Sequence, residues 1–201
     1  MFTGIVRELG IVVSAGEKRD GRVIVVAAPL AASTTGVGDS VSINGCCLTA
    51  ESVDGDRISF HAVQETLMRT TLGRLRADDR VNVESAVLAG DPLGGHYVQG
   101  HVDGVGRVQS VAAEGDGLRV FVESPDDVLR YCVEKGSVTV DGVSLTVAEV
   151  ADTAFAVALV PHTVEATTLS ELVPGREVNI EADVLAKYVE RLLPRGQRRG
   201  L

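Results

Sequence analysis

The chain has 201 residues, enough for two domains of about 100 residues each, and its 45% hydrophobic and 23% charged residues exclude a disordered protein. The net charge of -9 argues against nucleic-acid binding, and no apolar stretch approaches the roughly 18 to 20 residues that a membrane-spanning helix needs. We therefore expect a folded cytoplasmic protein whose partner is a small molecule, neither a nucleic acid nor a membrane.

In the first half of the chain, short runs rich in Val, Ile and Thr alternate with turn signals such as Asn44-Gly45. Asn-Gly between two such runs is a strong hairpin signal. The pattern predicts a small antiparallel barrel or sandwich. Examples of the predicted strands are Arg22–Ala27, Ser40–Ile43, Cys47–Val53, Arg57–Ala62 and Arg80–Glu84.

The segment from Thr66 to Leu75 has fewer β-branched residues, and we expect a short helix there with a Thr near its N-cap. Residues 89–95 form a cluster of Gly and Pro that is typical of a loop. The predicted elements of the first half end at this loop.

The second half of the chain repeats the first. The motif NGCCLT, which begins at Asn44, matches DGVSLT, which begins at Asp141, 97 positions later, and later segments match at the same spacing. Near the start the spacing is 96, so that Gly4 matches Gly100. Two repeats of this length indicate two related domains rather than a solenoid. We expect two tandem homologous domains at 1–90 and 94–182, followed by a helix and tail at 183–201.

The segment Ala182–Leu193 places its apolar residues on one stripe at helical spacing. This predicted helix has two possible roles, because its stripe can pack on its own domain or join subunits. The basic segment Pro194–Leu201 is expected to fray.

Several chemical classes lack support in the sequence. There is no Walker loop, dinucleotide fingerprint, HExxH or GxSxG motif. The cysteines Cys46, Cys47 and Cys132 do not have metal-ligand spacing, and His96 and His101, five residues apart in a Gly-rich turn, are only a weak signal for a metal site. We expect neither a metal nor a cofactor.

Polar residues that share positions in the two repeats are the candidates for ligand binding. Cys47 and Thr49 fall on one side of a strand, as do Ser144 and Thr146 in the second repeat, because side chains alternate along a strand. The alternative is that Thr simply suits strands, but the recurrence of the pair beside a turn favours two ligand sites. Two further pairs share positions: Ser40 with Ser137, and Thr66 with Thr163.

Taken together, these motifs resemble riboflavin synthase along nearly the whole chain. The resemblance rests on the opening MFTGIV, on NGCCLT, on GGHYVQGHVDG (94–104), on KGSVTVDGVSLTV (135–147) and on PHT followed by TTL. One departure is Ala50, where the family usually has Val after LT. This departure affects packing beside the site rather than its chemistry.

The resemblance implies an all-β chain of two six-stranded antiparallel Greek-key barrels with a C-terminal α-helix, assembled as a homotrimer around these helices. It implies that two molecules of 6,7-dimethyl-8-ribityllumazine exchange a four-carbon unit, giving riboflavin and 5-amino-6-ribitylamino-pyrimidinedione. One substrate would bind in the N-terminal barrel of one chain and the other in the C-terminal barrel of a neighbour, without a metal or cofactor.

The resemblance also implies the residues of both pockets. The first pocket would be lined by Ser40, Cys47, Thr49, Ala62, Val63, Thr66, Gly100, His101 and Val102. The second would be lined by Lys135, Ser144, Thr146, Val160, Pro161 and Thr163, with Gly4, Ile5 and Val6 reaching over from the N-terminus. The implied catalytic residues are Cys47, His101, Ser144 and Ser40, although a structural role in a tight turn is an equal alternative for His101.

Two other functions compete with the enzyme. A lumazine or flavin carrier would keep both barrels but lose polar residues from one of them, whereas here both repeats retain the motif. A tandem barrel that binds proteins would not need matched polar pairs. The sequence therefore favours the enzyme.

Overall fold

The first repeat folds into a closed six-stranded antiparallel barrel in the computed structural model, which describes residues 1–194. Around the barrel the strands follow the order β1-β2-β5-β4-β3-β6. Strands that are not consecutive in the chain, such as β2 and β5, are therefore neighbours, as in a Greek key. The strands are β1 (Glu8–Lys18), β2 (Gly21–Ala27), β3 (Ser40–Ile43), β4 (Cys46–Asp54), β5 (Arg57–Val63) and β6 (Arg80–Ser85).

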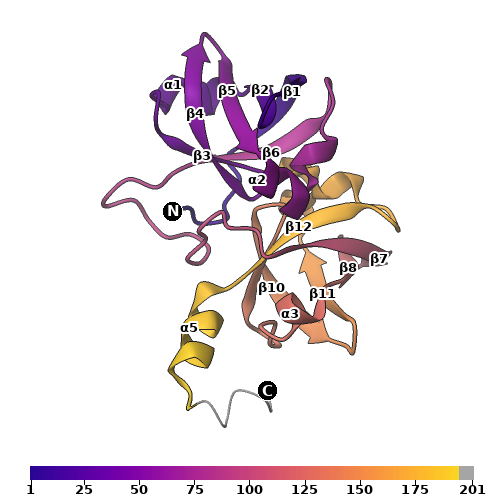
Figure 1. Cartoon of the computed structure of the whole chain (residues 1–201). Helices are drawn as coiled ribbons and strands as arrows, with labels where there is room; N and C mark the ends of the chain where they lie inside the picture. Colours follow the sequence, from indigo (N-terminus) through magenta and orange to yellow (C-terminus); the bar gives the residue numbers. More distant parts are fainter. Residues whose placement is uncertain (195–201) are drawn as a thin grey trace.

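The second repeat forms a second closed barrel with the same connectivity, in the order β10-β11-β8-β7-β12-β9. Figure 1 shows the two barrels as separate bodies joined at one end. The predicted fold class is confirmed, and the choice between barrel and sandwich is resolved in favour of the barrel. The strands are β7 (Gly104–Glu114), β8 (Gly117–Glu123), β9 (Ser137–Val140), β10 (Val143–Val150), β11 (Ala154–Leu159) and β12 (Glu177–Ala182).

Each barrel has its own apolar core, built by the alternation of its strands. On β2, for example, Ile24 and Val26 are fully buried, and Val120 and Val122 are their counterparts on β8. Ala50, which departs from the family pattern, also lies in the first core and is 1% exposed. Its side chain therefore contributes to core packing.

The short helices differ in one respect from the prediction, because the single helix expected over Thr66–Leu75 is two. Helix α2 (Gln64–Arg69) ends before Thr70, whose extended backbone precedes the 3-10 turn η1 (Thr71–Arg74). The Thr70 hydroxyl donates to the Thr66 carbonyl at 2.7 Å and accepts from the Leu72 N–H at 3.3 Å, so it caps the second helix and interrupts the first. The remaining short helices are α1 (Pro29–Thr34), α3 (Asp126–Leu129), α4 (Pro161–Ala166) and η2 (Thr168–Glu171).

The C-terminal helix α5 (Val184–Leu192) is present as predicted, capped by the Asp183 carboxylate. Its polar face binds the second barrel, since Lys187 pairs with Asp103 at 2.6 Å and Glu190 accepts from the Tyr131 hydroxyl at 2.6 Å. Its apolar stripe does not pack on this chain: Leu185, Tyr188, Val189 and Leu192 are 53%, 62%, 59% and 83% exposed. Figure 1 shows α5 beside the second barrel and away from the first.

None of the helices in residues 1–194 combines the length and apolarity needed to cross a bilayer. The predicted tail at Pro194–Leu201 lies outside the described residues beyond Pro194.

The barrels meet back to back through equivalent turns. Asn44-Gly45 and Asp141-Gly142 have nearly identical positive φ angles of 46° and 78°, and 47° and 79°. A Cβ atom added to Gly45 would lie 2.7 Å from the Gly142 nitrogen, and one added to Gly142 would lie 2.6 Å from the Gly45 nitrogen. Both turns therefore need glycine for their conformation and for the close approach of the barrels.

An amide network surrounds these turns. The Asn82 side chain donates to the Asp141 carbonyl at 2.9 Å and accepts from the Thr168 N–H at 2.8 Å. Asn179, its counterpart in the second barrel, makes the reciprocal bonds to the Asn44 carbonyl at 2.8 Å and the Thr71 N–H at 2.7 Å. We call this contact region between the barrels the seam. The two barrels are thus related by a pseudo-twofold axis that passes through the seam.

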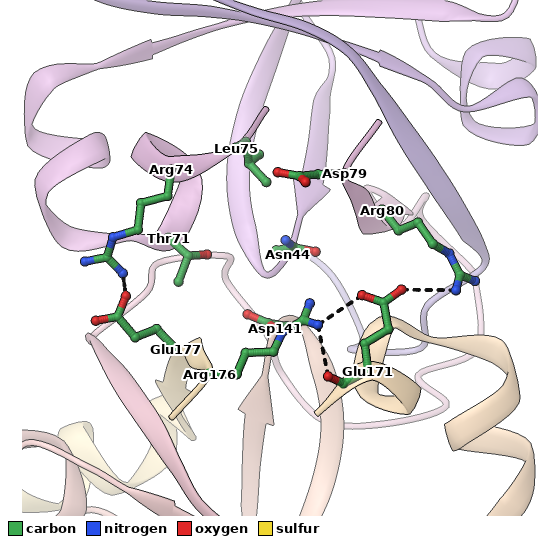
Figure 2. Close-up of a pocket in the computed structure, with 10 residues that line it drawn as sticks. All are labelled: Asn44, Thr71, Arg74, Leu75, Asp79, Arg80, Asp141, Glu171, Arg176 and Glu177. Carbon is green, nitrogen blue, oxygen red and sulfur yellow. Dashed lines mark hydrogen bonds and ion pairs between the residues drawn. The ribbon is translucent and has the colours of Figure 1, made fainter. Parts of the chain in front are cut away.

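Beside the turns lies a charged cavity of about 310 Å³ (Figure 2). Its Arg74 pairs with Glu177, and its Arg80 pairs with Glu171 at 3.1 Å, so each ion pair joins the two barrels. None of the residues that line this cavity is among the predicted site residues. We therefore assign it to the joining of the barrels.

Candidate functional site

Two extended segments lie between the barrels and pair with each other. We call residues 2–6 the N-terminal strap and residues 96–102 the linker strap. Phe2 and Val98 form an antiparallel bridge. The Phe2 N–H donates to the Val98 carbonyl at 2.7 Å, and the Val98 N–H donates to the Phe2 carbonyl at 3.2 Å. Figure 1 shows the N-terminus beside the junction of the barrels.

Each strap lies against the barrel that it does not lead into. The N-terminal strap leads into the first barrel, but Val6 packs against the core of the second and the Gly4 carbonyl accepts from the Ser144 N–H at 2.8 Å. The linker strap leads into the second barrel, but Val102 packs against the core of the first, and Gly100 accepts from the Cys47 N–H at 2.8 Å. The straps are thus exchanged between the barrels.

Glycine is required where each strap meets its strand. Gly4 and Gly100 have φ angles of +74° and +76°, which L-residues with side chains rarely adopt. A Cβ atom on Gly4 would lie 2.6 Å from the Cβ of Ser144, and one on Gly100 would lie 2.7 Å from the Cβ of Cys47. The straps therefore bring their backbone directly against Cys47 and Ser144, two of the four residues predicted to be catalytic.

A buried carboxylate holds each strap. Glu84 on β6 accepts from the Thr3 N–H, the Thr3 hydroxyl and the Gly4 N–H at 2.7, 2.8 and 3.0 Å. Glu181 on β12 accepts from the N–H groups of Gln99, Gly100 and His101 at 2.7, 2.9 and 3.0 Å. Burial raises the pKa of both carboxyls, and the N–H donors oppose this effect.

We call the predicted pocket residues around Cys47 the first half-site and those around Ser144 the second half-site. In the first half-site, Cys47 is half-buried and Thr49 is exposed on β4. Ser40 on β3 is the cross-strand partner of Thr49, so the three side chains fall on neighbouring strands. Val63 and Thr66 come from the end of β5 and from α2. Ala62 is fully buried in the barrel core, so the structure does not place this predicted residue at an open pocket.

The second half-site has the same plan. Ser144 is half-buried and Thr146 is exposed on β10, and Thr146 pairs across the strands with Ser137, the counterpart of Ser40. Exposed Lys135 lies before β9 with a positive φ of 66°. Val160, Pro161 and Thr163 come from the start of α4, where the first two are exposed.

A histidine that was not among the predicted site residues lies in this second half-site. The Nδ1 atom of His96 is 2.7 Å from the Ser144 hydroxyl oxygen, and His96 is 7% exposed. Burial lowers the pKa of His96, so the neutral imidazole is favoured. The repeat comparison had no means of finding it, because a residue 96 positions before His96 would precede Met1.

His101, the histidine chosen from the sequence, has an exposed side chain, and its described hydrogen bond is that of its backbone N–H to Glu181. The structure thus brings the side chain of His96 into hydrogen-bond contact with a predicted site residue, whereas His101 contributes its backbone N–H. The neighbouring thiol of Cys46 points into the barrel, where burial raises its pKa to about 12 and keeps it protonated.

The comparisons with known proteins find relatives of both barrels. A model of the lumazine binding domain matches the chain twice, over residues 3–86 and 99–183. The chain is 46% identical to the riboflavin synthase of Mycobacterium bovis over 198 residues, covering 96% of this chain and 98% of the relative. The chain belongs to the riboflavin synthase family.

The fold is also similar to that of LumP, whose crystal structures contain bound ligands. The crystal structures of LumP with riboflavin and with 6,7-dimethyl-8-(1'-D-ribityl) lumazine match the chain with TM-scores of 0.84 and 0.82 at 27% identity, covering 90% of this chain and 99% of LumP. The resemblance to riboflavin synthase is therefore confirmed, together with its transferase chemistry and its place in riboflavin biosynthesis.

Proposed function

We propose that the two half-sites each bind one 6,7-dimethyl-8-ribityllumazine and that a four-carbon unit passes between the two molecules. The products are riboflavin and 5-amino-6-ribitylamino-pyrimidinedione, which together contain every atom of the two substrates. The reaction therefore needs no oxidant and no cofactor. The observation that carries this proposal is the matched construction of the two half-sites, with Cys47 and Ser144 at equivalent positions under exchanged straps.

The main contribution of the protein is to hold two identical molecules in register. Positioning of two reactants lowers a barrier by roughly 7 to 11 kcal/mol when the reacting atoms are well aligned. Two related pockets across a pseudo-twofold axis suit this task, because the substrates are the same molecule.

The remaining catalysis is proton transfer. In the second half-site the neutral imidazole of His96 accepts the proton of the Ser144 hydroxyl, and this pair then exchanges a proton with the donor lumazine. In the first half-site the Cys47 thiol faces the acceptor lumazine and assists addition of a nucleophile. Ser40 and Thr49 hydrogen-bond the acceptor, as Thr146 does the donor.

The active site lies between chains of a homotrimer in this proposal. The apolar stripe of α5 supports the assembly, since its four side chains remain at least half exposed on the isolated chain. Such a stripe at helical spacing suits packing of three α5 helices around a common axis. The first half-site of one chain then faces the second half-site of its neighbour.

A complementation experiment tests both the reaction and the location of the site. The purified chain, given the lumazine alone, forms riboflavin, which is followed by its absorbance. One variant combines Thr49→Arg with Cys47→Ala, and the other combines Thr146→Arg with Ser144→Ala. A charged Arg blocks a pocket for a neutral heterocycle, so each homotrimer is nearly inactive.

Refolding an equal mixture of the two variants returns activity to about one quarter of wild type, because each contributing half-site is intact in half of the chains. Native mass spectrometry verifies that mixed trimers form. Mixed trimers without activity would place the whole site within one chain. No riboflavin from the wild-type chain would contradict the reaction itself.

A further inference from the structure

The buried carboxylates Glu84 and Glu181 occupy equivalent positions in the two barrels. Each makes equivalent hydrogen bonds to one of the two straps. They are 5% and 2% exposed, and each accepts three hydrogen bonds from the strap that leads into its own barrel. Three donors that converge on one carboxylate fix a strap more strongly than neutral acceptors do, because charge-assisted hydrogen bonds are about twice as strong.

A single residue then connects each carboxylate to the opposite half-site. The Gly4 N–H donates to Glu84 at 3.0 Å, and the carbonyl of the same residue accepts from the Ser144 N–H at 2.8 Å. In the other strap, the Gly100 N–H donates to Glu181 at 2.9 Å. The Gly100 carbonyl accepts from the Cys47 N–H at 2.8 Å. No flexible spacer separates the carboxylate from the strand of the other barrel.

We propose that Glu84 and Glu181 are positioning residues that act across the barrels. Glu84 of the first barrel positions the Ser144 half-site through the N-terminal strap, and Glu181 of the second barrel positions the Cys47 half-site through the linker strap. This inference rests on the assignment of the two lumazine pockets proposed above, and it adds that each pocket depends on a residue of the barrel to which it does not belong.

Each Glu has an isosteric probe in Gln. Glutamine keeps the shape of the side chain but replaces one acceptor oxygen by an NH₂ group, which faces an N–H donor of the strap. At least one hydrogen bond to the strap is lost, and the NH₂ group of Gln and an N–H group of the strap then face each other as two donors. The strap therefore shifts without a change in the volume of the core. A role limited to overall stability would weaken both pockets alike, whereas cross-barrel positioning weakens one.

The experiment measures binding at one pocket at a time in the full chain. Thr49→Arg closes the first pocket and leaves the second open, and Thr146→Arg does the reverse, since both residues are exposed at their pockets. Glu84→Gln and Glu181→Gln are then placed in each background, and riboflavin binding is followed by ligand fluorescence. The chain has no Trp to interfere.

We expect Glu84→Gln to weaken riboflavin binding about tenfold or more in the Thr49→Arg background, where only the Ser144 pocket is open, and by less than about twofold in the Thr146→Arg background. Glu181→Gln gives the opposite result in each background. Equal losses in both backgrounds, or losses confined to the pocket of the same barrel, would overturn the proposal.

A second measurement separates this inference from the pocket assignment and covers variants that bind no ligand. Glu84→Asp and Glu181→Asp keep the charge but withdraw the carboxylate by one methylene. Hydrogen exchange without ligand should accelerate at the Ser144 amide in the first variant and at the Cys47 amide in the second, with the other amide unchanged. Exchange that accelerates at both amides or at neither contradicts cross-barrel positioning. If both Arg backgrounds fail to bind riboflavin while the exchange pattern holds, the pocket assignment fails and the coupling stands.

Discussion

Asp141 differs in chemistry from Asn44, its pseudo-symmetric mate in the seam between the barrels. Asn44 and Asp141 occupy equivalent turns, and their side-chain oxygens accept from the N–H groups of Asn82 and Asn179 at 2.7 and 2.8 Å. Burial raises the Asp141 pKa to about 7, only partly offset by the Asn179 N–H and the charge of Arg176. An amide already serves in the same geometry in the first barrel.

We predict that Asp141→Asn stabilises the protein at neutral and higher pH. The folded pKa of Asp141 lies above its unfolded value of about 3.9. The contribution of Asp141 to the free energy of unfolding therefore falls as pH rises from about 4 to about 7, by about 1.4 kcal/mol per pH unit. The variant lacks this loss, so its advantage grows to at most about 4 kcal/mol above pH 7 and vanishes near pH 4. Urea unfolding at a series of pH values measures the difference.

The matched control for this prediction is Asn44→Asp, which places a second carboxyl in the equivalent turn. It should lower stability above neutral pH and leave it unchanged near pH 4. A free energy of unfolding that differs between Asp141→Asn and the wild type by the same amount at every pH would show that burial does not raise the pKa of Asp141.

Helix α5 illustrates how an element can be predicted from sequence while its packing is not. Its 3.6-residue apolar period predicts the helix and its stripe, but the same stripe fits packing on its own barrel or on another chain. The structure shows that ion pairs from Lys187 and Glu190 hold the polar face on the second barrel, which leaves the stripe exposed. The Thr66–Leu75 segment was mispredicted as one helix because the hydroxyl of Thr70 serves as a cap in mid-segment.

We predict that Leu185→Glu combined with Leu192→Glu dissociates the homotrimer proposed above. Burial of each Leu contributes about 1.5 to 3 kcal/mol, and this contribution is replaced by charge repulsion around the axis. Sedimentation should show monomers with little activity, while thermal unfolding still reports folded barrels. Val37→Glu, at a 71% exposed apolar residue of the first barrel, is the control and should remain trimeric and active. A trimer that survives the double substitution would exclude α5 as its centre.

At the scale of the whole molecule, the seam is charge-inverted across its pseudo-twofold axis. Arg74 and Glu171 are equivalent positions, as are Arg80 and Glu177, and Arg74 pairs with Glu177 while Arg80 pairs with Glu171. A pairing of two first barrels would bring Arg74 against Arg80, and a pairing of two second barrels would bring Glu171 against Glu177. The charges therefore favour pairing of unlike barrels.

We predict that Arg74→Glu with Arg80→Glu destabilises the seam, and that adding Glu171→Arg with Glu177→Arg restores part of the loss. Because these pairs are partly exposed, the first change should cost about 1 to 2 kcal/mol, or roughly 2 to 8 °C in melting temperature. Recovery is partial because Glu171 and Glu177 also pair with Arg176 and Arg107 of their own barrel, and the exchange removes these pairs. The matched control carries Glu171→Arg with Glu177→Arg alone, and calorimetry measures all three variants. A fourfold variant that is no more stable than the sum of the two double changes would show that shape, and not charge, selects the barrel partner.

The repeat made most of the fold predictable, because a pattern seen twice reduces the chance of a misassigned strand. It also led to the polar pairs around Cys47 and Ser144. What it did not predict are contacts that depend on three-dimensional neighbours: the carboxylates Glu84 and Glu181 read as ordinary strand ends, and His96 has no counterpart in the first repeat. Both depend on the path of the straps, which hydrophobic periodicity does not encode.

The joining of the two barrels in one chain has a consequence for how far the two half-sites can differ. In a pair of identical single-barrel subunits, any substitution appears in both pockets, so the two pockets cannot specialise separately. Joining the barrels in one chain removes that restriction. The chain can then carry a thiol at Cys47, a hydroxyl at Ser144, and an imidazole at His96 that only the linker supplies. Covalent linkage has thus turned a symmetric scaffold into two chemically distinct partners.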